Sequence, residues 1–251
     1  MSQIQTILEK IQGNLKNSQG TTEELNEYDC PECKDKEVII AELDGDWVMR
    51  ECKCKPKKKM RRLLKASGLT ESLREFTFNN LDPRPKQKEM YEEAYNYVKN
   101  YPEIKGQKCN GLAFTGTVGV GKTHLMAAIA NNLLAKGISV CFVNTPVLIK
   151  ELRKSQFEDS NKVEEQLEII SNAEVAIFDD LAKEKSTEWV QTQYYTIANN
   201  RYIKRLPTLF STNCDIDELE DKLGDATASR LYAMTKDRLI HVVDDDYRMI
   251  E

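Results

Sequence analysis

Five short apolar runs in the second half of the chain predict β-strands. They cover residues 111–114, 139–143, 175–178, 208–211 and 239–243. Stretches in which apolar side chains follow helical spacing separate these runs. Strands that alternate with helices form a mainly parallel sheet with helices on both faces. The pattern therefore predicts an α/β fold with a five-stranded parallel sheet.

The beginning of the chain has a different pattern. Apolar side chains at positions 4, 7, 8, 11 and 15 predict a short amphipathic helix. Its apolar stripe either packs on neighbouring residues of the protein or docks onto a partner helix. Further on, the apolar runs 38–40 and 47–49 flank Asp44 and Gly45, which are a strong signal for a β-hairpin turn.

A connector separates this beginning from the α/β domain. Gly68 and the two prolines within residues 82–85 interrupt any regular element there. We therefore expect an N-terminal module over residues 1–67, a linker over residues 68–85, and the α/β domain over residues 86–251.

Composition places the chain among globular proteins. It has 251 residues, 40% of them hydrophobic and 31% charged, and a net charge of −5. No run approaches the ~18 consecutive apolar residues that a membrane-spanning helix needs, which excludes a membrane protein. The first ten residues lack the basic and apolar parts of a secretory signal. These features predict a cytoplasmic protein.

The negative net charge hides one strongly basic segment. Eight lysines and arginines, and no acidic residue, lie between Lys53 and Lys65. Such a run is commonly a solvated face, but its charge density also favours binding to a polyanion through counterion release. A solvated surface and a contact with nucleic acid both stay open as interpretations.

Four of the seven cysteines form two close pairs, Cys30 with Cys33 and Cys52 with Cys54. The predicted hairpin between the pairs brings them together, and four thiolates from two loops suit tetrahedral Zn²⁺. The metal would also replace the core that so short a segment cannot build. Disulfides are the alternative, and the lack of a secretory signal disfavours them. We predict a zinc site, although the second pair has one intervening residue rather than two.

A complete G-x-x-x-x-G-K-T motif follows the first predicted strand of the α/β domain. Its glycines let backbone N–H groups cradle phosphate at the N-terminus of the next helix. Lys122 is expected to reach the β- and γ-phosphates, and Thr123 to bind Mg²⁺. The predicted contacts to ATP or ADP are Gly116, Thr117, Val118, Gly119, Val120, Gly121, Lys122, Thr123 and the adjoining His124.

Two later strands end in polar residues that suit phosphate chemistry. Asp179 and Asp180 follow one apolar run, and Asn213 follows the next. Because the carboxyl ends of parallel strands meet at one edge of a sheet, these side chains are expected beside the phosphate loop. We assign Asp179 to Mg²⁺, Asp180 to orienting or deprotonating the attacking water, and Asn213 to holding that water. The alternative for the two acids is a solvated turn.

Together with the sequence Ala228-Ser229-Arg230, these motifs resemble the AAA+ ATPases of the DnaA/DnaC clade. A cysteine module followed by a basic stretch is similar to the bacterial and phage helicase loaders of the DnaC/DnaI type, with the transposition ATPase IstB as a near relative. The resemblance implies an AAA+ P-loop fold, and the eight residues after Val243 are too few for the C-terminal lid of the wider group. It implies slow hydrolysis, with ATP acting as a switch for conformation and assembly.

The resemblance also implies roles for individual residues. Asn213 becomes the sensor of the γ-phosphate, and Arg230 becomes an arginine finger offered to a neighbouring subunit, with a surface ion pair as the alternative. Phe157, Thr187 and Trp189 occupy positions comparable to those with which loaders bind single-stranded DNA. Core packing is the alternative for Phe157 and Trp189.

The function implied by the resemblance is ATP-dependent helicase loading in DNA replication. The N-terminal module would bind a hexameric replicative helicase of the DnaB type, while self-associated AAA+ domains hold single-stranded DNA. Two alternatives stay open. One is an IstB-like ATPase that regulates DNA transposition, and the other is a nucleotide-gated adaptor that does not hydrolyse ATP.

Overall fold

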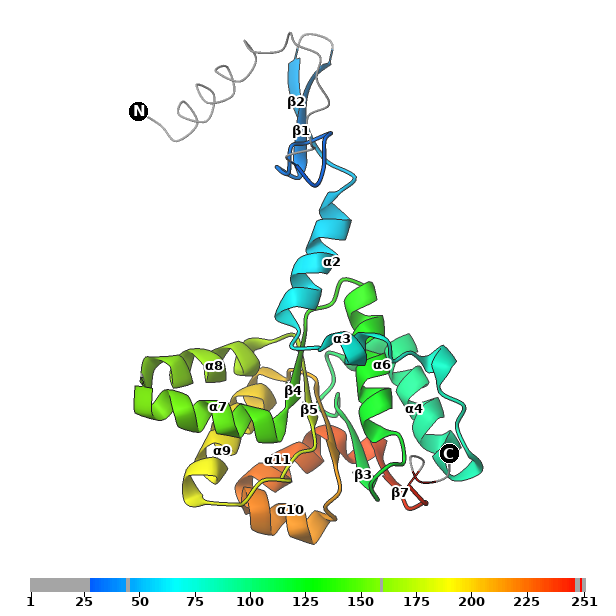
Figure 1. Ribbon diagram of the computed structural model, residues 1–251, viewed down its shortest axis with the longest axis vertical. Coiled ribbons are helices and arrows are strands. Elements are labelled where there is room, and N and C mark those ends of the chain that lie inside the picture. The colour runs from blue at the N-terminus through cyan, green and yellow to red at the C-terminus, as the bar shows by residue number, and fades with distance from the viewer. Residues whose placement is uncertain (1–27, 44–45, 159, 247–248, 250–251) are drawn as a thin grey trace. The chain divides into compact units, whose positions relative to one another are not determined.

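The computed structural model describes residues 28–43, 46–158, 160–246 and 249. The chain divides into two compact units, Met1–Lys55 and Pro56–Glu251 (Figure 1). The amphipathic helix expected at the N-terminus and the turn residues Asp44 and Gly45 lie outside the described residues. Within the described residues, no helix has both the length and the apolar character needed to cross a bilayer.

The first unit is built on the expected hairpin. β1 (Val38–Leu43) pairs antiparallel with β2 (Asp46–Glu51), which confirms the predicted strand pairing. Every side chain of β2 is exposed. In the described part of this unit, the buried apolar side chains are those of Cys30, Cys33 and Cys52. The unit therefore has a cysteine cluster where a larger domain has an apolar core.

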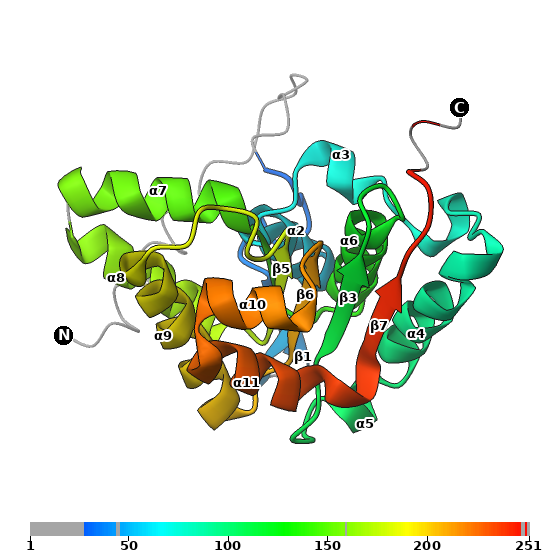
Figure 2. The ribbon, with the colours of Figure 1, turned by 90° about the horizontal axis from the view of Figure 1, so that it is seen from below.

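Five parallel strands form the sheet of the second unit, in the order β4-β5-β6-β3-β7 (Figure 2). They are β3 (Leu112–Gly116), β4 (Val140–Asn144), β5 (Val175–Asp179), β6 (Thr208–Thr212) and β7 (Leu239–Val242). Each confirms one predicted strand. Because β5, β6 and β3 are neighbours, the segments that follow them meet at one edge of the sheet, as the sequence predicted.

Helices cover both faces of this sheet (Figure 2). Side chains alternate along β3, so that Leu112 and Phe114 belong to one apolar cluster and Ala113 belongs to the other. The first cluster includes α4 (Lys88–Lys99), α5 (Tyr101–Ile104) and α6 (Lys122–Ala135). The second includes α7 (Thr145–Glu158), α8 (Ser160–Asn172), α9 (Glu188–Lys204), α10 (Ile216–Leu223) and α11 (Asp225–Thr235).

Residues 68–85, expected to be a linker, form part of the second unit. They contain α3 (Glu71–Arg74) and the 3₁₀ helix η1 (Phe78–Asn80). Leu69 and Phe78 are buried in the apolar cluster of α4 and α6, and the Asn131 side-chain amide donates to three backbone carbonyls of the segment. The prolines and Gly68 indicated a break in regular structure, but apolar side chains between them fix the segment to the core.

Three further helices complete the described elements. α2 (Lys55–Ala66) begins at the last residue of the first unit, and its Leu63 and Leu64 pack on the core of the second. The 3₁₀ helices η2 (Pro85–Gln87) and η3 (Lys236–Arg238) precede α4 and β7. The compact units therefore divide after Lys55, twelve residues before the end expected for the N-terminal module.

A buried arginine joins α8, α9 and β6. Arg201 is fully buried, and its guanidinium donates to the carbonyls of Ile170 (2.8 Å), Ala173 (2.9 Å) and Pro207 (2.6 Å). Its Nε donates to the Thr208 hydroxyl at 2.9 Å. Burial lowers the pKa of Arg201 to about 10. These neutral acceptors satisfy the N–H groups of a cation that has left water.

Candidate functional site

The phosphate loop connects β3 to the N-terminus of α6. Gly116 and Gly121 both have positive φ, of 126° and 90°, and Gly121 is the N-cap of the helix. A Cβ at Gly116 would lie 1.8 Å from the Val242 carbonyl oxygen, so only glycine fits between the loop and β7. The loop therefore presents its backbone at the positive end of a helix dipole, as phosphate binding requires.

Lys122 is folded into this loop. Its Nζ donates to the carbonyls of Gly116 (2.9 Å) and Thr117 (2.7 Å), and to Asn213 Oδ1 at the end of β6 (2.7 Å). Burial lowers the pKa of Lys122 to about 8, although the nearby carboxylates of Asp180 and Asp179 favour the charged form. The lysine and the expected sensor amide are thus in direct contact.

Asp179 lies opposite the first turn of α6. The Thr123 hydroxyl donates to both of its carboxylate oxygens, at 3.0 and 3.1 Å, and the Ser211 hydroxyl donates to Oδ1 at 2.5 Å. Burial raises the pKa of Asp179, and the hydrogen bonds from Ser211 and Thr123 oppose that rise. A hydroxyl and a carboxylate oxygen at this spacing are ligands that Mg²⁺ prefers, so the residues present fit the ion.

Asp180 is held by different partners. It has a positive φ of 56°, its backbone N–H donates to Ser211 Oγ at 3.1 Å, and its carboxylate pairs with Lys183 at 2.7 Å. Its side chain lines the same cavity as Lys122. The structure therefore brings Lys122, Thr123, Asp180 and Asn213 to one cavity. Asp179 does not line this cavity but contacts it through the Thr123 hydroxyl.

The cavity has a volume of about 510 Å³. Val118, Gly119 and Gly121 contribute the phosphate-loop side. The opposite side, here called the base wall, comes from the segment expected to be a linker and from η2. The residues of the base wall are Phe76, Asn80, Leu81, Asp82 and Gln87.

His124 belongs to the boundary between the two sides. Its ring stacks on Phe76 with the ring centroids 4.4 Å apart, and its Nε2 lies 2.9 Å from the Thr77 carbonyl oxygen. Sequence reasoning missed the base wall, because Phe76 and Leu81 carry no motif. The one signal was the apolar spacing between Gly68 and the prolines.

The four predicted zinc ligands form a second cluster, in the first unit. The sulfur atoms of Cys30, Cys33, Cys52 and Cys54 all lie within 4.8 Å of one another. The sulfur atoms of Cys30 and Cys52 are 3.8 Å apart, and those of Cys33 and Cys54 are 3.3 Å apart. A disulfide needs about 2.05 Å, whereas a tetrahedron of thiolates around Zn²⁺ with bonds of about 2.3 Å has sulfurs somewhat under 4 Å apart. The cysteines are free thiols whose arrangement fits Zn²⁺.

Comparison with known proteins assigns the chain to a family. A family model described as "IstB-like ATP binding protein" matches residues 22–245. The chain belongs to this family. It is 30% identical to the uncharacterized protein YqaM of Bacillus subtilis (strain 168), over 96% of this chain and 92% of that protein.

Two helicase loaders are also similar to this IstB-like protein. The replicative helicase loader DnaI of Bacillus subtilis (strain 168) is 34% identical over 68% of this chain, and the match spans 55% of DnaI. A crystal structure of the DnaC helicase loader superimposes with a TM-score of 0.60 and 26% identity, covering 69% of this chain and 99% of that one. The IstB-like chain therefore has an AAA+ fold related to those of DnaC and DnaI.

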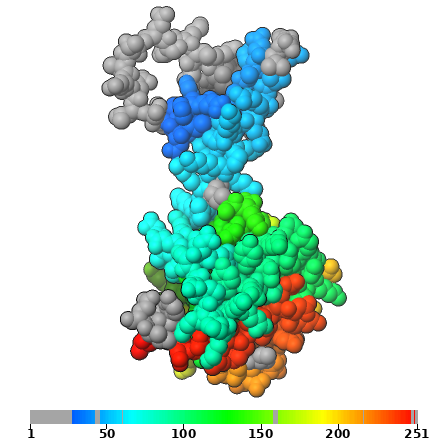
Figure 3. All heavy atoms as spheres, turned by 90° about the vertical axis from the view of Figure 1, so that its right-hand side faces the viewer, coloured from blue at the N-terminus to red at the C-terminus, as the bar shows by residue number. Residues whose placement is uncertain are grey.

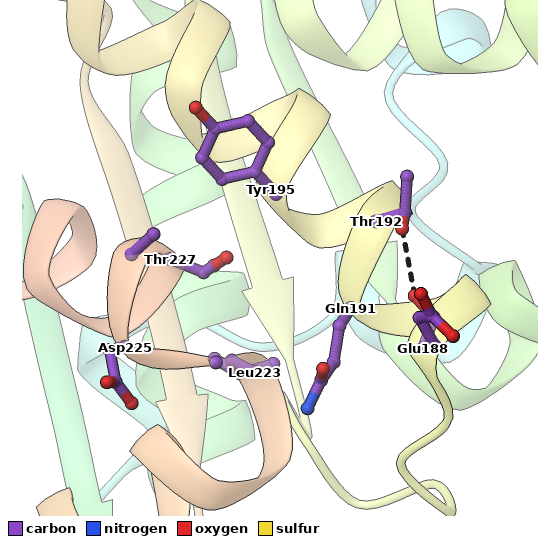
Figure 4. A pocket seen from close by; sticks show the side chains of 9 residues that line it. Glu188, Gln191, Thr192, Tyr195, Leu223, Asp225 and Thr227 are labelled. Atoms are coloured by element: carbon purple, nitrogen blue, oxygen red, sulfur yellow. Dashed lines mark hydrogen bonds between the residues drawn. The ribbon is translucent and has the colours of Figure 1, made fainter.

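Arg230 lies away from the nucleotide cavity of the IstB-like domain. On α11, its guanidinium donates to Asn199 Oδ1 (3.0 Å) and the Ala226 carbonyl (2.7 Å), and lies 5.0 Å from the centre of the Tyr195 ring. These contacts are to neutral groups rather than to the carboxylate of an ion pair. Beside them is an open pocket of about 450 Å³ between α9 and the start of α11, where Tyr195 and Thr227 lie (Figure 4).

The residues expected to contact DNA lie on α7 and at the start of α9. Arg153 Nη2 lies 3.5 Å from the Thr187 hydroxyl, and the guanidinium is 5.9 Å from the centre of the Trp189 ring. Trp189 packs in part against the core. Phe157, one turn along α7 from Arg153, is 89% exposed, so core packing is excluded for it.

Proposed function

We propose that this IstB-like protein is an ATP-dependent loader of a hexameric replicative helicase of the DnaB type. The observation that carries the proposal is the hydrogen bond between Lys122 and Asn213, which joins the phosphate-binding lysine to the amide expected to sense the γ-phosphate. Its similarity to DnaI and DnaC, both named as helicase loaders, supports this choice among the functions of the AAA+ fold.

ATP would act on this hydrogen bond. A triphosphate in the loop offers Lys122 anionic oxygens, which compete with the carbonyls of Gly116 and Thr117 and with Asn213 Oδ1. Asn213 is then released to contact the γ-phosphate. Asn213 lies in the short segment that connects β6 to α10. A movement of Asn213 when nucleotide binds would therefore change the position of this segment at the surface of the domain.

Hydrolysis would use the remaining residues of the cavity. Thr123 and Asp179 would hold Mg²⁺, which neutralises phosphate charge when bound. Asp180 would orient the attacking water, while its ion pair with Lys183 keeps the carboxylate in place. Arg230, on a surface away from this cavity, would serve the nucleotide of a neighbouring subunit, so turnover would depend on self-association.

Each of the two units would bind a different partner, the first unit the helicase and the second unit single-stranded DNA. The four cysteines would hold Zn²⁺ and so fix the hairpin that binds the helicase. Phe157, Thr187 and Trp189, with Arg153 among them, would contact single-stranded DNA by stacking and by phosphate pairing.

Helicase loading tests the proposal directly. The full-length protein is mixed with the replicative helicase of its host and a circular single-stranded DNA, with and without ATP, and DNA-bound helicase is measured. We expect loading that requires both the protein and ATP, and impaired loading by Arg230→Ala despite unchanged ATP binding by the monomer. No complex with the helicase and no change in loading would refute the proposal.

The family description itself favours a second candidate, an IstB-like regulator of DNA transposition. That function predicts ATP-dependent binding of this protein to duplex DNA and recruitment of a transposase, and measuring this protein on a DNA duplex with and without ATP tests the first of these. Phosphate release separates both candidates from a non-hydrolysing adaptor, which would bind ATP tightly and release no phosphate with or without single-stranded DNA.

A further inference from the structure

Two of the three aspartates that follow β7, Asp244 and Asp246, lie against the phosphate loop. The Thr117 hydroxyl donates to the Asp244 carbonyl at 2.8 Å and accepts from the Asp244 backbone N–H at 3.1 Å. The backbone N–H of Thr117 donates to the Val242 carbonyl at 3.1 Å. Thr117 of the loop therefore makes three hydrogen bonds to the end of the edge strand β7 and to the segment that follows it.

The third aspartate approaches the loop even more closely. A Cβ added to Gly119 would lie 2.8 Å from the Asp246 Cα and 1.9 Å from its Oδ1. Gly119 has a positive φ of 78° as well, so both the backbone conformation and the close approach require glycine. Residues 244–246, here called the clasp, thus contact the loop through Asp244 and Asp246, whose backbones lie close to the loop backbone.

The carboxylate of Asp244 faces away from Thr117, toward the segment that builds the base wall. It lies 3.4 Å from Lys86 Nζ and 3.7 Å from Arg84 Nε, and Arg84 Nη2 donates to the Asp245 carbonyl at 3.0 Å. The side chains of Asp244 and Arg84 are only 10% and 27% exposed, so water screens this pair less than it screens a surface ion pair, whereas Lys86 is 67% exposed. Figure 3 shows the red end of the chain next to the blue-green segment that contains these cations.

Arg84 precedes η2 and Lys86 lies within it, and the last residue of η2, Gln87, lines the cavity. The Arg84 backbone N–H donates to Gln87 Oε1 at 3.2 Å, and Gln87 is a buried member of the base wall. Leu81 of the same wall lies 4.0 Å from the Cβ position of Gly121, so the wall touches the phosphate loop at this point. Asp244 therefore has its backbone on the phosphate loop and its side chain beside Arg84 and Lys86, two cations that adjoin Gln87 of the base wall.

We propose that Asp244 is a positioning residue that couples the phosphate loop to the base wall and so sets the affinity for nucleotide. A nucleotide that touches both walls gains from having them held at the right separation beforehand. The inference rests on the proposed nucleotide site and goes beyond it, because neither the motif nor the sensor includes this segment.

The sign of one mutational effect separates positioning from simple electrostatics. Asp244 and Asp245 are adjacent carboxylates near a site for a polyanion, and removing either charge would strengthen binding if charge alone mattered. Positioning predicts the opposite result for Asp244 only. Asp245 is exposed, and among the described residues its carboxylate makes no hydrogen bond or ion pair, so Asp245→Asn is a control with the same change in charge.

The first test compares the affinities of the full-length variants for a fluorescent ATP analogue at constant ionic strength. We expect Asp244→Asn to weaken binding about five- to tenfold, Asp244→Glu to recover part of the loss, and Asp245→Asn to bind as tightly as wild type or more tightly. Equal affinities for Asp244→Asn and Asp245→Asn would overturn the proposal. Thermal melting of all variants shows whether a loss of affinity reflects unfolding.

The second test needs no nucleotide. Amide hydrogen exchange is measured in the free protein for peptides that cover residues 81–87 and 116–121. Asp244→Asn should speed exchange in both peptides and Asp245→Asn in neither, and unchanged exchange in Asp244→Asn would overturn the proposal. Failure of the wild-type protein to bind the ATP analogue would instead refute the proposed nucleotide site, while the exchange result still decides the role of Asp244.

Discussion

The two units of the chain are stabilised by different means. In the described part of the first, the buried apolar side chains are three cysteines, and Trp47 on β2 is 74% exposed. In the second, a five-stranded sheet buries both faces against helices. A unit of 55 residues buries so little apolar surface that its stability is marginal, whereas a domain near 200 residues can build a sufficient core. This difference predicts that the first unit needs a bound metal to fold and that the second does not.

Removing the metal should have the largest effect, because it should unfold the first unit and leave the second folded. Loss of zinc forfeits a binding free energy of roughly 10 kcal/mol or more, which is also the folding free energy of so small a unit. Cys33→Ser, or chelation, should therefore unfold the hairpin and leave the α/β domain intact. The measurement is hydrogen exchange over residues 38–51, read beside ATP binding. A hairpin that keeps its protection without metal would contradict the comparison.

Lys122→Ala should remove the chemistry of the second unit without disturbing the first. The substitution deletes the cation that contacts phosphate, so we expect ATP affinity to fall at least about 100-fold, on the scale of a lost charge-assisted contact. Zinc content and melting of the protein should stay near wild type. Isothermal titration with ATP measures the change, and Lys136→Ala, at the C-cap of the same helix, serves as the control. Undiminished affinity would contradict the assignment of the loop.

Replacing Arg201 tests how much a buried polar network contributes to the stability of the second unit. Arg201→Met leaves the carbonyls of Ile170, Ala173 and Pro207 without their donor, so we expect unfolding to become easier by about 3 kcal/mol. Urea unfolding followed by circular dichroism gives the value. Lys185→Met, at an exposed position, should change stability by less than about 0.5 kcal/mol. Equal effects of the two substitutions would mean that the buried guanidinium does not hold these elements together.

A smaller effect should follow from pH. Because the pKa of Lys122 is lowered to about 8, the lysine of the free protein becomes neutral as pH rises through that value. Phosphate binds the charged form, so ATP affinity should be constant between pH 7 and 7.5 and fall above pH 8, approaching tenfold per unit. The dissociation constant measured across this range, in wild type and in Lys122→Arg, tests the effect. A profile that is flat to pH 10 in wild type would exclude it.

Sequence reasoning succeeded where a local pattern determines the structure. The strand ending at Gly116 needs glycines to pass β7 and to cap α6, so the motif fixes both the loop and its place in the fold. The runs that became β5 and β6 were recognisable by their apolar length, and parallel pairing then placed Asp179 and Asn213 beside the loop. The two cysteine pairs likewise converged because a hairpin joins them.

The base wall and the clasp could not be predicted, for a physical reason. Phe76 and Leu81 face the cavity because residues 68–85 pack on α6, and such packing depends on the whole core rather than on nearby residues. The ion pairs of Asp244 join positions about 160 residues apart in sequence, from surface charges that resemble any others. Arg230 also needed the fold to separate it from the nucleotide cavity.

The central claim is that nucleotide exchanges the partners of Lys122. A crystal structure with a non-hydrolysable ATP analogue and Mg²⁺ tests it most directly. We expect Lys122 Nζ to leave Asn213 Oδ1, now 2.7 Å away, and to contact the phosphates, with Thr123 and Asp179 at the metal. A structure in which the analogue binds elsewhere, or in which Lys122 keeps its contact with Asn213 while the site is filled, would contradict it.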